Sequence, residues 1–206
     1  MISPENLTGE KGKGAMAVPD HGNQSLPFYK AAEHLGQGWK VNPFVKPKPG
    51  ETITIMDVES PGMIQHIWMA TEPKWRGNCH ACILRFYWDD EKDPSVEVTL
   101  TDLFTVGHDL FARVSSLAVI MNPMAALNCY WPMSFPKHAK VTFTNEGDNE
   151  LGLLTYQITY AKLKIPENIG FFHAQWRKFA IDPLSPDYII LDGVKGQCKY
   201  VGTFLA

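Results

Sequence analysis

The chain has 206 residues, of which 45% are hydrophobic and 12% aromatic, so it can build one sizeable core and is too apolar for general disorder. Its formal net charge of -3 gives no long-range attraction for nucleic acid or for an anionic membrane, so we expect neither as a partner. No apolar run approaches the ~20 residues of a membrane helix, and the N-terminus lacks the apolar core of a secretory signal, which predicts a cytoplasmic protein.

Residues 1–50 are rich in Gly, Pro, Asn and Lys and show almost no sustained periodicity. Their glycine-rich start does not have the spacing of a phosphate-binding loop, which needs Gly, four residues and then Gly-Lys-Ser/Thr. A short helical turn fits residues 30–35, and the glycines and prolines that follow exclude a longer helix. We therefore predict a loop-rich segment, 1–50, packed on a single domain that spans 1–206.

From Glu51 onward, short runs of alternating apolar and polar residues are separated by turn residues. Strands are predicted at 51–58, 63–69, 79–88, 95–104, 117–122, 126–131, 139–145, 152–163, 187–192 and 199–205. Many short strands with little helix indicate an all-β antiparallel sandwich or barrel. We prefer a jelly roll, because long connections alternate with tight ones. An immunoglobulin-type sandwich is the alternative, but its Cys-Trp-Cys framework is missing.

The stretch from Ile83 to Leu100 predicts a β-hairpin with a defined register. Pairing Phe86 with Val96 and Leu84 with Val98 sets apolar on apolar across the ladder. The same register places Arg85 opposite Glu97 on the other face, where we expect a partly solvated cross-strand ion pair. These hairpin residues, together with Trp88, lead the predicted core, which also includes Leu100, Val119, Val141, Phe143 and Ile158.

The cysteines and histidines do not form a metal-binding pattern. Cys79-His-Ala-Cys82 has the spacing of a zinc half-site, but no second pair of ligands follows, so buried thiols are expected. The seven histidines contain no pair one residue apart, which a metal-dependent cupin would need. We expect no metal and no organic cofactor.

Acidic residues cluster between Asp89 and Asp93, in the loop of the predicted hairpin. A carboxylate pair could support hydrolysis, but four acids within five residues are typical of a solvated turn. No Gly-X-Ser-X-Gly motif is present for a serine nucleophile.

A second cluster, FFHAQWRK at residues 171–178, offers an imidazole, an amide, an indole and a guanidinium in one short extended run. If the run is a strand, Gln175 and Arg177 project to one side beside His173, and Trp176 faces the other side. Such a mixture holds sugars, with an aromatic face against C–H groups and forked donors for hydroxyls. The alternative is structural, with Trp176 in the core and Arg177 paired with a carboxylate.

Six segments together resemble one bacterial family. They are ISPENLTGEKGKG near the start, PGMIQHIW at 61–68, ILRFYWDDEKDPSVEVTLTDLF, NCYWPMSFPKHAKVTFTN, FFHAQWR and YIILDGVKGQCKYVGTFLA. The family was first described as a domain of unknown function and later placed in glycoside hydrolase family 172. The resemblance covers nearly the whole chain.

The resemblance implies a jelly-roll protomer, related to double-jelly-roll capsid proteins, that assembles as a trimer or a multiple of trimers such as a hexamer. Characterised members act on furanosides, as α-D-fructofuranosidase, difructose dianhydride I synthase/hydrolase and D-arabinofuranosidase, without an organic cofactor. It further implies that a furanose-containing oligosaccharide is the ligand. The matching segments suggest a groove lined by the Glu5-Asn6 and Thr8-Gly9 loop together with His173, Gln175, Trp176 and Arg177.

Family members continue past the YVGT segment into a second jelly roll, where two glutamate motifs supply the catalytic residues. No residue of this chain matches either motif, so its catalytic residues stay unassigned. Two functions therefore compete: the N-terminal half of a furanoside hydrolase, which works with a second jelly-roll polypeptide, or a non-catalytic oligomeric module for carbohydrate binding or assembly. A metal-dependent cupin-like enzyme is a third reading.

Overall fold

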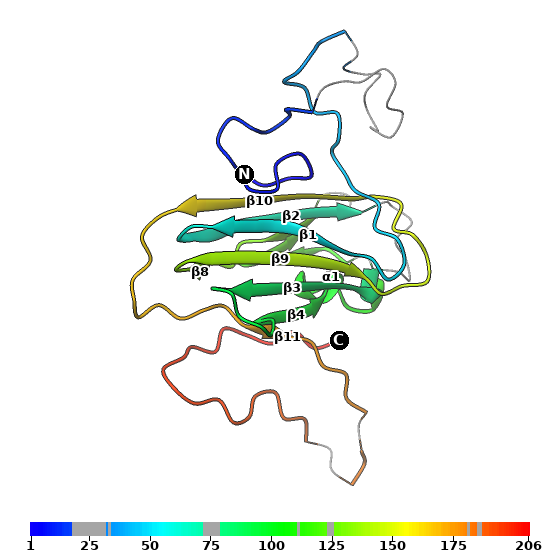
Figure 1. Cartoon of the computed structure of the whole chain (residues 1–206). Helices are drawn as coiled ribbons and strands as arrows, with labels where there is room; N and C mark the ends of the chain where they lie inside the picture. Colours follow the sequence, from blue (N-terminus) through cyan, green and yellow to red (C-terminus); the bar gives the residue numbers. More distant parts are fainter. Residues whose placement is uncertain are drawn as a thin grey trace.

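Two β-sheets pack face to face as a sandwich in the computed structural model, which describes residues 1–17, 32, 34–71, 79–110, 112–122, 126–180, 182–184 and 187–206 (Figure 1). The first sheet has the order β1-β9-β3-β4-β11, with β1 Thr52–Glu59, β9 His138–Asn145, β3 Cys82–Trp88, β4 Val96–Thr99 and β11 Ala174–Gln175. The second has the order β10-β2-β7-β6-β5, with β10 Leu154–Lys162, β2 Gly62–Thr71, β7 Leu127–Cys129, β6 Val119–Met121 and β5 Val114–Ser115, and β8 Met133–Phe135 also pairs with β2.

The strand pairs are antiparallel except for β11, which runs parallel to β4. Three short helical pieces complete the described elements, namely η2 Cys79–Ala81, α1 Leu100–Leu103 and η3 Gly107–Asp109. The predicted all-β sandwich is confirmed, and its jelly-roll winding stays a prediction. In the described part of the chain, no helix is long and apolar enough to cross a membrane.

The hairpin β3–β4 has the predicted register. Phe86 pairs with Val96, Leu84 with Val98 and Arg85 with Glu97. Arg85 Nε donates to Glu97 Oε2 over 2.6 Å, and the ion pair is partly solvated, with side-chain exposures of 23% and 55%. The guanidinium also donates to Glu146 and Thr144, so one side chain ties β4 to β9 and to the turn that follows β9.

The core lies between the sheets, and all of its predicted members are buried: Leu84, Phe86, Trp88, Val96, Val98, Leu100, Val119, Val141, Phe143 and Ile158. Alternation along the strands explains this arrangement, because every second residue of β3 is buried from Cys82 to Trp88. The Trp88 ring packs edge-on against Phe86 and stacks with Phe135 from the other sheet. The hairpin is therefore the centre of the sandwich.

The predicted strand 95–104 is wrong in its second half. β4 ends at Thr99, and residues 100–103 form helix α1. The Thr99 hydroxyl accepts a hydrogen bond from the backbone N–H of Asp102, and it donates to the Asp102 carboxylate over 2.8 Å. This reciprocal cap satisfies the first turn of the helix and ends the strand.

Two further strand predictions need correction. Segments 187–192 and 199–205 form no strand, and their apolar side chains are exposed because no strand among the described residues pairs with them. An additional buried strand, β8, lies between the strands predicted at 126–131 and 139–145. The helical turn predicted at 30–35 lies mostly outside the described residues.

The N-terminal segment packs along β10, where Figure 1 shows its loop beside the edge of the second sheet. Ile2 is fully buried and exchanges two backbone hydrogen bonds with Ile158. Farther along, Val45 pairs in the same way with Leu154, and the carbonyl of Pro43 accepts a hydrogen bond from Thr155. Pairing with this segment covers an edge of β10 that would otherwise be open.

Candidate functional site

The run 171–177 is held at the edge of the first sheet by β11. Ala174 and Gln175 pair with Val96 and Glu97 of β4, and the backbone N–H of Trp176 donates to the Glu97 carbonyl over 3.1 Å. One step earlier, the indole N–H of Trp88 donates to the Phe172 carbonyl over 2.8 Å. The core hairpin thus fixes both ends of the run.

Side chains along this run alternate in exposure. Phe172 and Ala174 pack against the core, while His173, Gln175 and Arg177 are exposed. Trp176 is 41% exposed, so it is not a core residue. Nor does any described carboxylate lie within ion-pair distance of Arg177. The structural alternative for this run therefore fails on both counts.

The indole of Trp176 contacts the imidazole of His80. Their ring centroids are 5.2 Å apart at an interplanar angle of 76°. The buried Nδ1 of His80 has no hydrogen-bond partner and lies 3.4 Å from Oδ2 of Asp102, whose side chain is 12% exposed. A half-exposed indole, an imidazole and a carboxylate therefore adjoin the exposed donors of β11.

The loop after α1 supports this cluster with unusual backbone geometry. Thr105, His108 and Asp109 all have left-handed φ values, of 59°, 57° and 51°. Asp109 is buried, and its carboxylate accepts hydrogen bonds from the His80 backbone N–H and from the Thr101 hydroxyl. Left-handed conformations cost non-glycine residues free energy, and such strain is often concentrated at functional sites.

The sequence contained one usable signal for these missed residues. Thr99 and Asp102 have the spacing of a capping pair, which would have placed the start of a helix and the Asp102 carboxylate next to β4. His80 carried no such signal, because only the folded chain brings it to Trp176.

The other predicted site segment, the loop of residues 1–10, is organised around Asn6. The Asn6 amide donates to the carbonyls of Met1 and Glu10, and its side-chain oxygen accepts from the Glu10 backbone N–H. Glu5 Oε1 accepts hydrogen bonds from the backbone N–H groups of Val41 and Asn42, over 2.9 and 2.6 Å. Asn6 and Glu5 therefore hold this loop in shape.

Gly9 should tolerate alanine far less well than Gly12. Both have left-handed φ, of +66° and +78°, but a Cβ on Gly9 would lie 2.6 Å from Tyr160 Cε1, whereas Gly12 has open space around it. Gly12→Ala should cost about 1–2 kcal/mol of unfolding free energy from backbone strain alone. Gly9→Ala should cost about 1–3 kcal/mol more, from the clash. Urea denaturation of the two variants checks this, and equal losses would show that the loop is not seated on Tyr160.

One chain does not bring the two predicted segments into a shared groove, and that expectation needs correction. The N-terminal loop lies on β10, at the edge of the second sheet, and residues 173–177 lie at the β11 edge of the first sheet. Figure 1 shows them on opposite sides of the sandwich. Of these two described segments, the β11 edge is the one that combines exposed donors with a half-exposed aromatic ring, so it is the stronger candidate site.

Residues 34–181 match a family model described as the GH172 first beta-sandwich domain. The match covers more than half of the chain. This chain belongs to glycoside hydrolase family 172. Comparison with curated proteins gives no match.

The bounds of the family 172 match include one of the two predicted site segments and leave out the other. It ends at residue 181, so it includes β11 and the run from His173 to Arg177. It begins at residue 34, so Glu5 and Asn6 lie outside it. The β11 edge is therefore part of the sandwich that defines this GH172 domain.

Two buried thiols of this GH172 domain, those of Cys82 and Cys129, are poorly suited to bind metal as thiolates. Burial, reinforced by the charge of Asp109, raises the pKa of Cys82 to about 12, and burial raises that of Cys129 to about 11. Metal ligation needs the deprotonated thiolate. Among the residues that the structure describes, no group of three or more His, Cys, Asp or Glu side chains could hold a metal ion.

Proposed function

We propose that this chain is the substrate-holding first sandwich of a furanoside-directed glycoside hydrolase. The observation that carries the proposal is the half-exposed Trp176, edge-on to His80 and flanked by the exposed donors of Gln175, on β11, and Arg177, just after it. It supports sugar binding, because these groups lie together at one edge of a glycoside hydrolase sandwich.

Each group has a role that its chemistry suits. The Trp176 ring offers an apolar face to the C–H groups of a furanose. The Arg177 guanidinium and the Gln175 amide donate to ring and hydroxyl oxygens, and the Asp102 carboxylate accepts hydrogen bonds from hydroxyls. His173 lies next to them on the exposed side of the run.

Cleavage is assigned to the two glutamates that family members carry in a second jelly roll. The acids of this chain support that division of labour, because several are already engaged in holding the structure. Glu5 binds two backbone N–H groups, Asp109 is buried with both oxygens bonded, and Asp89 accepts from the backbone of Lys137 and His138. The catalytic pair of a retaining glycosidase needs two carboxyl groups about 5–5.5 Å apart, one of them protonated. Acids that already hold the backbone are not free to form such a pair.

Replacing Arg177 with alanine should abolish measurable sugar binding and leave the melting temperature nearly unchanged, because the side chain is exposed and has no described carboxylate partner. Lys178→Ala, one residue along, also removes one exposed positive charge and is the matched control, with binding retained. Isothermal titration with furanose oligosaccharides measures the affinity. If Arg177→Ala loses as much stability as binding, Arg177 has a structural role and the prediction is wrong.

A non-catalytic assembly module is the second candidate, favoured by the apolar surface of the C-terminal segment. Large apolar side chains there are 37% to 94% exposed, namely Leu184, Tyr188, Ile189, Ile190, Leu191, Val194, Tyr200, Val201, Phe204 and Leu205. Apolar surface on this scale is typical of a contact with another protein surface. We propose a homotrimer or hexamer, or a second jelly-roll polypeptide, as the partner.

Light scattering at micromolar concentration should therefore give a mass well above the 23.2 kDa of one chain. Leu191→Asp should lower that mass, because it places a charge in the apolar segment. Leu117→Asp, at a fully exposed position away from this segment, should leave it unchanged. A single species of monomer mass for the parent chain would contradict self-association.

A further inference from the structure

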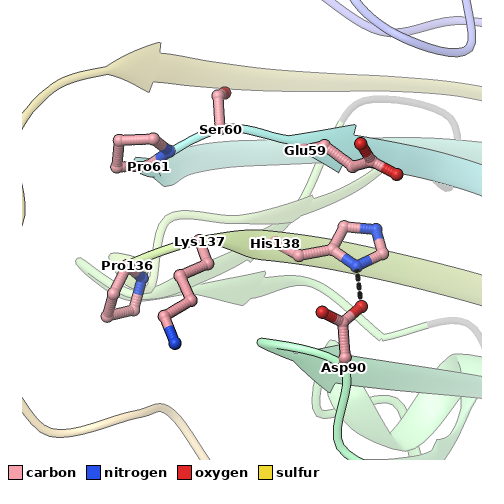
Figure 2. Close-up of a pocket in the computed structure, with 7 residues that line it drawn as sticks. All are labelled: Glu59, Ser60, Pro61, Asp90, Pro136, Lys137 and His138. Atoms are coloured by element: carbon pink, nitrogen blue, oxygen red, sulfur yellow. Dashed lines mark hydrogen bonds and ion pairs between the residues drawn. The ribbon is translucent and has the colours of Figure 1, made fainter.

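His138, the first residue of β9, lies between two carboxylates on the outer side of the first sheet. Its Nε2 is 2.8 Å from Oδ1 of Asp57 on β1, and its Nδ1 is 2.5 Å from Oδ1 of Asp90 in the turn after β3. The imidazole is only 15% exposed. Figure 2 shows Asp90 reaching the ring from its turn.

Both ring nitrogens therefore face acceptors. A neutral imidazole has one N–H and can donate to only one carboxylate, whereas an imidazolium donates to both. The other charged and titratable groups on this side of the three elements are mixed in sign. They are Glu59 on β1, Tyr87 near the end of β3, Asp89 and Glu91 in the turn, Lys137 just before β9 and Lys140 on β9. The protonation state of His138 decides how many of its two bonds exist.

The turn that carries Asp90 is also held by bonds that do not titrate with His138. Asp89 and Asp90 have left-handed φ values of 51° and 67°. The Asp89 carboxylate accepts from the backbone N–H groups of Lys137 and His138, and its own N–H donates to the His138 carbonyl over 2.9 Å. Loss of the His138 proton leaves one ring N–H for two carboxylates, so it would weaken the hold on Asp90 and loosen the turn without unfolding the hairpin.

Asp90 and His138 line a shallow surface cavity of about 400 Å³, together with Glu59, Ser60, Pro61, Pro136 and Lys137 (Figure 2). We propose that Asp57, His138 and Asp90 form a proton-dependent hydrogen-bonded triad. The triad holds Asp90 against β9 and releases the Asp90 side chain, at the rim of this cavity, as the pH rises. This role is separate from the β11 edge.

The direction of the effect follows from the competing influences on the imidazole. Burial lowers the pKa of His138, but the hydrogen bonds and charges of Asp90 and Asp57 outweigh burial, so the pKa lies above its ordinary value of 6.5. The stabilisation is therefore fully present below the unfolded-state pKa of about 6.5 and is lost as the pH rises through the higher folded-state pKa. Both hydrogen bonds of the triad are present in mildly acidic solution, and one of them is lost in alkaline solution.

Histidine-ring NMR of the whole chain across pH 5 to 9 tests the proposal, with the exposed His34 as an internal reference signal. The His138 ring should titrate with an upward-shifted midpoint, and Asp57→Asn together with Asp90→Asn should move that midpoint down. Each single variant should move it part of the way. A midpoint at the ordinary histidine value, or one that the double variant leaves in place, would overturn the proposal.

Backbone amide exchange gives a second readout that a merely structural histidine would not move. In the parent chain, the amide of Glu91, which donates to the Trp88 carbonyl across this turn, should lose protection as the pH rises past the His138 midpoint, after correction for intrinsic exchange. His138→Gln should remove that step. If His138→Gln does not fold, Asp90→Asn, altered at a 77% exposed side chain, serves instead. Equal protection at all pH values in the parent would overturn the proposal.

Discussion

Replacing Phe86 with alanine should lower the unfolding free energy by about 3–5 kcal/mol, the cost of removing a large buried ring and leaving a cavity. Phe86 is 1% exposed, pairs with Val96 and Val141, and packs edge-on against Trp88 with ring centroids 5.9 Å apart. Its loss therefore loosens the centre of the sandwich rather than one edge. Urea denaturation measures the change.

Phe86→Leu is the matched control, because it keeps most of the buried volume and should cost less than half as much as the alanine variant. Unfolding of the alanine variant at the same denaturant concentration as the parent would mean that the hairpin does not form the core. A fall in midpoint with an unchanged slope would show lost stability without a change in the surface exposed on unfolding.

Purified chain should not hydrolyse furanosides at an enzymatic rate, and mixing it with a polypeptide that carries the second jelly roll should restore turnover. The expected difference is large, since loss of a catalytic carboxylate pair removes most of the rate enhancement that glycosidases supply. Aryl α-D-fructofuranoside and aryl D-arabinofuranoside are suitable substrates, with release of the aryl group as the measurement.

Two variants identify which acids act if the chain alone proves active. Glu5→Gln would remove an acceptor of two backbone hydrogen bonds, so it should loosen the N-terminal loop. Glu10→Gln alters an exposed side chain in the same loop and should leave the fold unchanged. Turnover by the parent chain that disappears in either variant would overturn the assignment of cleavage to a second jelly roll.

The register of the hairpin could be predicted from sequence because several features agree there. Apolar residues alternate with period two, the opposite charges of Arg85 and Glu97 fall in register, and a one-residue slip would turn Leu84 and Phe86 toward water. The alternation reaches Leu100 and fails at Asp102, where the chain forms α1, because the bonds between Thr99 and Asp102 stabilise a helix start. A strand extended to Phe104 disregards that break.

The strands predicted at 187–192 and 199–205 are wrong because these segments have strand-like composition but no strand partner among the described residues. Residues 187–192 contain Ile189, Ile190 and Leu191, which have high strand propensity, but no strand of the described chain pairs with them. Strand propensity becomes a strand only when a ladder partner satisfies the backbone. The sequence of one chain carries no information about partners outside it.

The sequence predicted one part of the candidate site and missed another. The run from His173 to Arg177 was visible because its chemistry is contiguous, and the structure places it as an exposed edge with Trp176 outside the core. His80 was not visible, because only the fold brings η2 to Trp176, and Asp102, which lies against His80, was signalled only by its capping spacing from Thr99. The N-terminal loop was assigned to the same groove on resemblance alone, and its own hydrogen bonds hold it at the other side of the sandwich.

The short strand β11 also protects β4 from aggregation. β4 would otherwise present its backbone donors and acceptors at the end of the first sheet, where a second chain could add a strand. Two paired residues and the Trp176 N–H block that position. A protein shortened to end before residue 174 would therefore keep most of its core and expose the edge of β4, and we expect it to precipitate more readily than the parent chain.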